Sequence, residues 1–75
     1  MVQQQQQDSS SSLVILRLPA VKARTGLSRS TIYLRIAQGG FPQPVSLGGR
    51  AVGWIEAEVQ AWVRQCVQDA RGATA

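Results

Sequence analysis

The clearest periodic pattern lies in the last third of the chain. Its apolar side chains are spaced by three and four residues: Val59, Trp62, Val63, Cys66, Val67 and Ala70. This spacing is typical of one face of an amphipathic helix, and Glu56 and Glu58 precede it, where carboxylates favour the helix dipole. We predict a helix from about Ile55 to Ala70. Its apolar stripe should pack in the core of the chain itself, with docking to another protein as the alternative.

A shorter helical segment comes near the start of the fold. Pro19 suits the first position of a helix, where its missing N–H is not needed. We predict a helix from Pro19 to about Thr25 with Val21 facing inward. Gly26 should end this helix in the left-handed conformation that glycine tolerates.

A second short helix should begin immediately after this turn. Ser28 is the expected N-cap, and the helix should run from Arg29 to about Gln38, with Ile32 and Ile36 on its core face. Two short helices joined by a turn that contains glycine predict a helix-turn-helix.

The segment from Val45 to Trp54 alternates apolar and small or polar residues, as a β-hairpin does. Pro44 favours an extended approach, and Gly48-Gly49 suits a tight two-residue turn, with a flexible loop as the alternative. We therefore expect a mainly α fold with a small β-hairpin, a winged helix-turn-helix. Its core should hold most of the aromatic mass, which comes from Phe41, Trp54 and Trp62.

The ends of the chain differ from this pattern. Residues 1–12 are mostly Gln and Ser, a composition that cannot bury enough apolar surface to fold, so we expect a disordered tail. The folded domain should span residues 13–70, and residues 71–75 should be a flexible C-terminus. The tail lacks the basic start and apolar stretch of a signal peptide. No apolar run approaches the ~20 residues that span a bilayer. A cytoplasmic protein with no membrane contact is expected.

Charge is distributed unevenly along the chain. Six of the eight basic residues lie between Ser9 and Ile55, where there are no acids: Arg17, Lys22, Arg24, Arg29, Arg35 and Arg50. The net charge of +4 is therefore +6 in this stretch, −1 in the tail and −1 in the C-terminal segment. A one-sided basic surface attracts a polyanion, and ordinary solubilising charge is the alternative.

The chain has few residues suited to catalysis or metal binding. The chain has one cysteine, Cys66, and no histidine, which excludes an intramolecular disulfide and zinc-finger spacing. Cys66 should be a buried thiol on the apolar stripe, with a redox or dimer-linking role as the alternative. General acid–base catalysis would depend on a few acids or Tyr33, so we expect neither an enzyme nor a bound cofactor or metal.

The polar residues of the second helix are the candidate site. In a helix-turn-helix the N-terminal part of that helix enters the DNA major groove. There arginine can bond guanine, and serine or threonine can bond bases or phosphates. Tyr33 would either contact a phosphate or complete the packing. Arg50, at the hairpin tip, would contact phosphates or the minor groove, or remain a solubilising charge. The predicted DNA-binding residues are Ser28, Arg29, Ser30, Thr31, Tyr33, Arg35 and Arg50, with Lys22 and Arg24 as phosphate neighbours.

Four stretches together carry a family resemblance: LRLPAV (16–21), TGLSRSTIY (25–33), GGFPQPVSLGGRAVGW (39–54) and EVQAWV (58–63). In this order they resemble the AlpA family of small phage and prophage regulators, which is similar to MerR-type DNA-binding domains and phage excisionases. The resemblance covers about residues 16–67. It implies a winged helix-turn-helix that binds specific double-stranded DNA sites, either to regulate transcription of mobile-element genes or to direct excision.

The expected partners follow from the small size of the predicted DNA-reading surface. One recognition helix and a wing read few base pairs, so we expect a monomer that associates cooperatively on direct repeats of its DNA site. An integrase would be a further partner in excision. The alternative function is a small protein-interaction adaptor or anti-repressor that uses the last helix.

Overall fold

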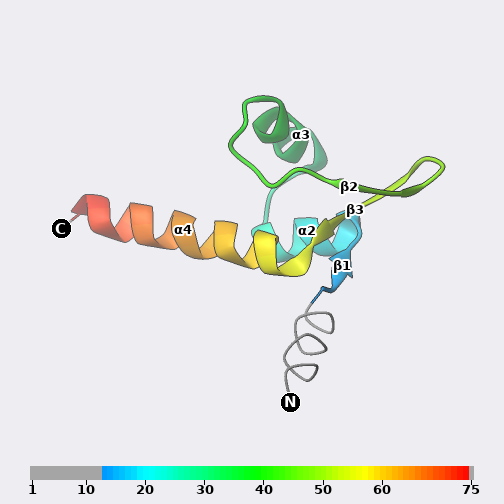
Figure 1. The fold of residues 1–75 in the computed structure, drawn as a ribbon. Coiled ribbons are helices and arrows are strands. Elements are labelled where there is room, and N and C mark those ends of the chain that lie inside the picture. The colour runs from blue at the N-terminus through cyan, green and yellow to red at the C-terminus, as the bar shows by residue number, and fades with distance from the viewer. Residues whose placement is uncertain (1–12, 75) are drawn as a thin grey trace, which may run out of the picture.

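A computed structural model describes residues 13–74 (Figure 1). The elements follow in the order β1 (Ile15–Leu16), α2 (Leu18–Thr25), α3 (Arg29–Ala37), β2 (Val45–Gly48), β3 (Ala51–Ile55) and α4 (Glu56–Thr74). All three predicted helices and the hairpin are present, and α2 and α3 lie within one residue of the predicted bounds. The predicted Gln/Ser tail lies outside the described residues.

A glycine separates the first two helices, as predicted. Gly26 has φ 73° and ψ 8°, in the left-handed region, and its N–H donates to the carbonyl of Lys22. The next helix, α3, then begins after Ser28. In Figure 1, α3 lies at the top of the molecule, the long α4 extends to the left, and the β-hairpin of β2 and β3 extends to the right. Most residues of α3 are exposed to solvent.

The sheet has a third strand that the sequence did not predict. Its order is β1-β3-β2, and both pairings are antiparallel. Ile15 pairs with Ile55, and Leu16 pairs with Trp54. A strand of two residues is too short to show alternation, so only its pairing with β3 reveals it.

The hairpin turn lies one residue later than predicted. The two residues between the strands are Gly49 and Arg50, and the register shifts between Ser46 and Gly48, as in a β-bulge. Gly48 and Gly49 have φ 103° and 56°, values that suit glycine. The extra residue of the bulge moves the turn, and Arg50 therefore lies within it.

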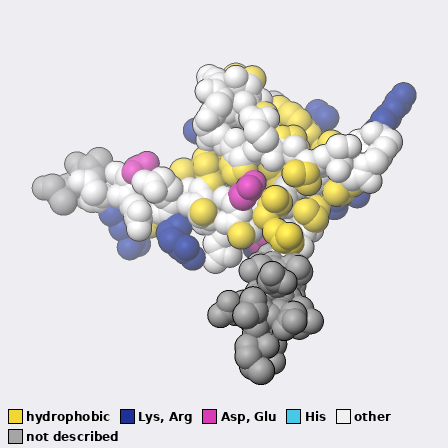
Figure 2. Space-filling view, in the orientation of Figure 1, with side chains coloured by type: hydrophobic (Ala, Val, Ile, Leu, Met, Phe, Trp, Pro, Cys, Tyr) yellow, Lys and Arg dark blue, Asp and Glu magenta, His cyan; other side chains and the backbone are white. Residues whose placement is uncertain are grey.

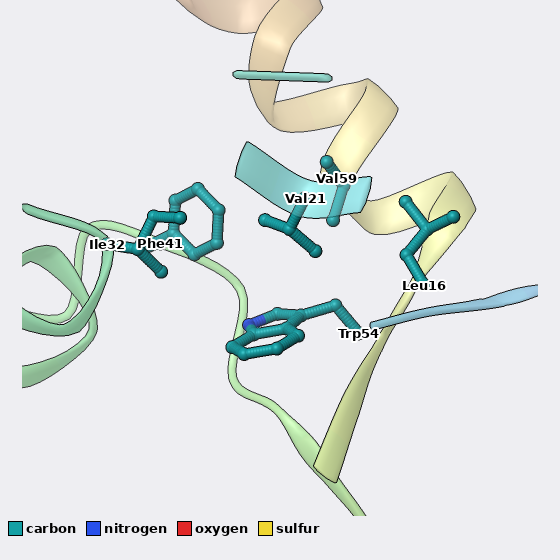
Figure 3. Close-up of a cluster of buried hydrophobic side chains, with 6 residues drawn as sticks. All are labelled: Leu16, Val21, Ile32, Phe41, Trp54 and Val59. Carbon is teal, nitrogen blue, oxygen red and sulfur yellow. The ribbon is translucent and has the colours of Figure 1, made fainter. Parts of the chain in front are cut away.

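A small core joins every part of the fold. Its buried side chains are Leu16, Val21, Ile32, Phe41, Trp54 and Val59. In Figure 3 the Trp54 ring lies below Val21, with Phe41 and Ile32 on one side and Leu16 on the other. Trp54, Ile32 and Val21 are fully buried, which confirms their predicted inward positions. The core thus ties α3 to the sheet, α2 and α4.

The last helix is longer than predicted, and only part of its stripe is covered. Val59 is buried and Trp62 and Val63 are half-buried, but Cys66 and Val67 are exposed. The prediction of a buried Cys66 thiol was therefore wrong. The physical reason is length: Val59, in the first turn of α4, belongs to the buried core, and the helix continues well past it (Figure 1), so Cys66 and Val67 are not covered by the part of the chain that the structure describes. Within residues 13–74, no helix is long and apolar enough to cross a bilayer.

Candidate nucleic-acid interface

The start of α3 is organised by one serine. The backbone of Ser28 is extended, and its Oγ accepts a hydrogen bond from the Thr31 backbone N–H at 3.2 Å. This confirms the predicted N-cap. The Ser28 hydroxyl also donates to the Thr31 hydroxyl at 3.0 Å and lies 3.3 Å from the Ser30 hydroxyl. The structure thus brings these three hydroxyls together at the exposed end of the helix.

An aromatic stack supports the first arginine of α3. The Arg29 guanidinium carbon lies 5.1 Å from the centre of the Tyr33 ring. Tyr33 in turn meets the buried Trp54 edge-on, with 6.2 Å between ring centres. A guanidinium over an aromatic face is electrostatically favourable. Tyr33 therefore packs against the core on one side and holds an exposed cation on the other, in agreement with the packing role that was one of its two predicted roles.

The other side of α3 carries Thr31 and Arg35, which are four residues apart and therefore neighbours on the helix surface. Thr31 is half-buried and Arg35 is exposed. Between the two sides lies Leu34, whose side chain is 57% exposed. Leu34 was not among the predicted DNA-binding residues. Helical periodicity could have identified its outward position, because Leu34 comes two residues after the buried Ile32 and so lies about 200° around the helix, opposite the core.

The loop after α3 is anchored by α4. The Trp62 indole N–H donates to the Gly40 carbonyl at 2.7 Å, and the Trp62 ring meets the Phe41 ring edge-on at 4.8 Å between centres. This contact joins residues 22 positions apart in sequence. No local pattern reveals such a contact, so its role in holding the loop after α3 was not predicted.

The hairpin carries its own cation. Arg50 is exposed in the turn between β2 and β3. Figure 2 shows a basic side chain that projects from the far end of the hairpin. The prediction that Arg50 lies at the tip of the hairpin is confirmed, although the turn lies one residue further on than expected.

The two predicted phosphate neighbours on α2 differ in their surroundings. Lys22 and Arg24 are both exposed in the last turn of α2. Arg24 forms an ion pair with Glu56, with 2.8 Å between Nη2 and Oε2, whereas the Lys22 side chain makes no hydrogen bond or ion pair within residues 13–74. Part of the Arg24 charge is therefore neutralised at the start of α4.

These parts define the class of protein. Two short helices meet at a left-handed glycine, the second helix is capped by serine and exposes arginines and hydroxyls, and a β-hairpin lies beside it. This arrangement is a winged helix-turn-helix. The family model for the prophage CP4-57 regulatory protein (AlpA) matches residues 14–67. The chain therefore belongs to the AlpA family, as its sequence motifs suggested. This is a family of regulatory proteins, in agreement with the expectation that the chain is not an enzyme.

Two relatives show how far the similarity extends. The uncharacterized protein ORF88 of Enterobacteria phage P4 is 56% identical over 48 residues, which is 64% of this chain and 54% of the phage protein. The DNA-binding transcriptional activator AlpA of Escherichia coli (strain K12) is 46% identical over 57 residues, covering 68% of this chain and 81% of that protein. The match thus spans about half the length of the phage P4 relative.

Proposed function

We propose that this chain binds specific double-stranded DNA sites and regulates transcription of prophage genes. The observation that carries the proposal is the exposed face of α3, where Arg29, Ser30 and Arg35 lie in a stretch with no acidic residue. The 46% identical relative named as a DNA-binding transcriptional activator supports it. In this proposal α3 enters the major groove, as recognition helices do.

The proposed contacts divide by what each side chain can reach. Arg29, Ser30 and Thr31, at the start of α3, meet base edges, and Arg35 follows along the groove. Tyr33 supports the Arg29 guanidinium with its ring. Lys22 and Arg24 meet phosphates, with Arg24 the weaker because Glu56 already pairs with it. Arg50 reaches the backbone or the minor groove beside the helix.

The first experiment measures affinity against salt concentration. The probe is a duplex identified by footprinting DNA next to the gene for this chain, with a scrambled duplex as control. Since each phosphate contact releases counterions, log K should fall against log salt with a slope of roughly −3 to −5. A slope near zero would contradict nucleic-acid binding of any kind.

Three variants then test the division of contacts. Arg29→Ala should reduce the preference for the footprinted duplex by about 1–3 kcal/mol. Lys22→Ala should weaken both duplexes alike, since phosphate contacts carry no sequence information. Arg64→Ala is the matched control, because it removes an exposed arginine on α4, away from α3. Equal losses on both duplexes for Arg29→Ala would show that α3 does not read bases.

A finer proposal is a role in excision, with an integrase as partner and cooperative self-association on DNA. The specific observation that favours self-association is the uncovered part of the α4 stripe, which includes Cys66 and Val67. An exposed apolar face of this kind is also what an adaptor would use. Titration of duplexes with one, two and three direct repeats separates these roles. Binding that steepens with repeat number supports self-association, and a preference for an inverted repeat contradicts the head-to-tail arrangement.

A further inference from the structure

Leu34 occupies the centre of the outward face of α3. At about 100° per residue, it lies about 200° around the helix from Ile32, which is fully buried. Ser30 lies one turn earlier on the same side. Among the large apolar side chains that the structure describes, only Leu13 is more exposed, at 62% against 57% for Leu34. An exposed apolar side chain therefore occupies the face of α3 opposite the core.

The surroundings of Leu34 are polar and basic. Arg29 and Tyr33 lie on one flank of this face, and Thr31 and Arg35 lie on the other. Apart from Tyr33, whose ring carries the Arg29 guanidinium, the other large exposed apolar residues that the structure describes lie elsewhere, in and before the sheet and on α4. A surface that docks an apolar protein face gathers several such side chains. Leu34 instead offers a single apolar contact between cations, which fits a strip of base edges bordered by phosphates.

One base edge in the major groove presents an apolar group. Thymine carries its C5-methyl there, and apolar side chains recognise it by direct contact. The other groups on base edges in this groove are hydrogen-bond donors and acceptors, which leucine cannot satisfy. Leucine at this position would therefore favour A·T or T·A pairs over G·C pairs.

We propose that Leu34 is a specificity residue that packs against the C5-methyl group of a thymine in the DNA site. This inference rests on the proposed DNA binding by α3 and deepens it. Hydroxyls and arginines on the flanks hold the helix in register, and Leu34 selects a thymine beneath its centre. The loss of one buried methyl group, at about 0.8 kcal/mol, corresponds to about a fourfold loss of affinity.

The DNA probe for the test is obtained by selection with the full chain. A random-sequence duplex pool is selected on the full chain, and the tightest single-site duplex is resynthesised with each thymine replaced in turn by uracil. Uracil pairs identically but lacks the methyl group. The wild-type chain should lose about fourfold in affinity at one or two positions. Leu34→Ala should bind the parent duplex more weakly and show no further loss at those positions.

Two more variants test whether the apolar end of Leu34 is what matters. Leu34→Gln retains the length and helix propensity of the side chain but not its apolar end, so it should also lose the sensitivity to uracil. Leu13→Ala removes another exposed leucine, which lies before β1, and should retain the sensitivity. Circular dichroism checks that each variant is folded.

The outcomes distinguish a failure of the proposed DNA binding from a failure of the proposed Leu34–thymine contact. If no sequence is enriched, or binding does not depend on salt, the proposed function itself fails. If the chain binds its selected duplex but wild type and Leu34→Ala respond alike to uracil at every position, Leu34 does not contact a methyl group. That result would overturn this inference and leave DNA binding by α3 standing.

Discussion

We predict that replacing Gly53 with alanine destabilises the sheet. It is buried in β3 between the two other strands. A Cβ at this position would overlap Ile15 Cγ2 and would lie 3.1 Å from the Leu16 carbonyl oxygen and 3.2 Å from Leu47 Cδ1. Gly53 is not among the residues with positive φ, so the backbone itself would accept alanine. The effect of Gly53→Ala should therefore come from the overlap alone.

The size of the effect follows from two opposing contributions. Alanine in a strand stabilises by roughly 0.5–1 kcal/mol relative to glycine, whereas overpacking typically costs about 1–3 kcal/mol. Here the cost should reach the upper end, because the Leu16 carbonyl is backbone and cannot move without disturbing the pairing of β1 with β3. We expect Gly53→Ala to lower the free energy of unfolding by about 2 kcal/mol, and the melting temperature by roughly 10 °C.

The assay is urea unfolding followed by tryptophan fluorescence, which reports the exposure of the fully buried Trp54. Ile15→Ala removes the overlapping methyl group, so the double variant with Gly53→Ala should be about 1 kcal/mol more stable than the sum of the single effects predicts. Gly72→Ala is the matched control, because a Cβ there meets no atom within 4 Å. If Gly53→Ala is as stable as wild type, or if Ile15→Ala recovers nothing, the steric reasoning is refuted.

Three other predictions concern the candidate interface. Trp62→Phe should keep the ring contact with Phe41 but lose the hydrogen bond to the Gly40 carbonyl. It should therefore cost about 0.5–1.5 kcal/mol of stability in urea unfolding; an unchanged midpoint would contradict this. Tyr33→Leu should weaken DNA binding, whereas Tyr33→Phe should retain it, since the ring and not the hydroxyl supports the Arg29 guanidinium. Equal affinities of the two variants in a gel-shift titration would show that the stack plays no part. Arg50→Ala should reduce affinity without changing the thermal melt, because the turn makes no core contact.

Much of the fold follows from short-range patterns. The left-handed glycine after α2 and the cap at Ser28 depend on residues within one helical turn, and both are present as predicted. Inward positions such as Ile32 follow from helical periodicity. The acid-free basic stretch and the family motifs are likewise properties of the sequence alone. Local preferences and periodicity suffice for these features because each involves neighbours along the chain.

Other features depend on what lies across the molecule. The two-residue strand β1 exists because β3 pairs with it, and the bulge before Gly48 moves the hairpin turn by one residue. Cys66 has the same periodic spacing as Val59, yet only Val59 is buried, since periodicity identifies a face but not how far the core extends along it.

The same limit applies to the candidate site. The sequence identifies Arg29 and Tyr33 as residues of the second helix, but only packing against Trp54 places the ring beneath the guanidinium. The contact from Trp62 to Gly40 also crosses from one element to another. These contacts form because segments distant in sequence pack around one core, so only the tertiary structure determines them.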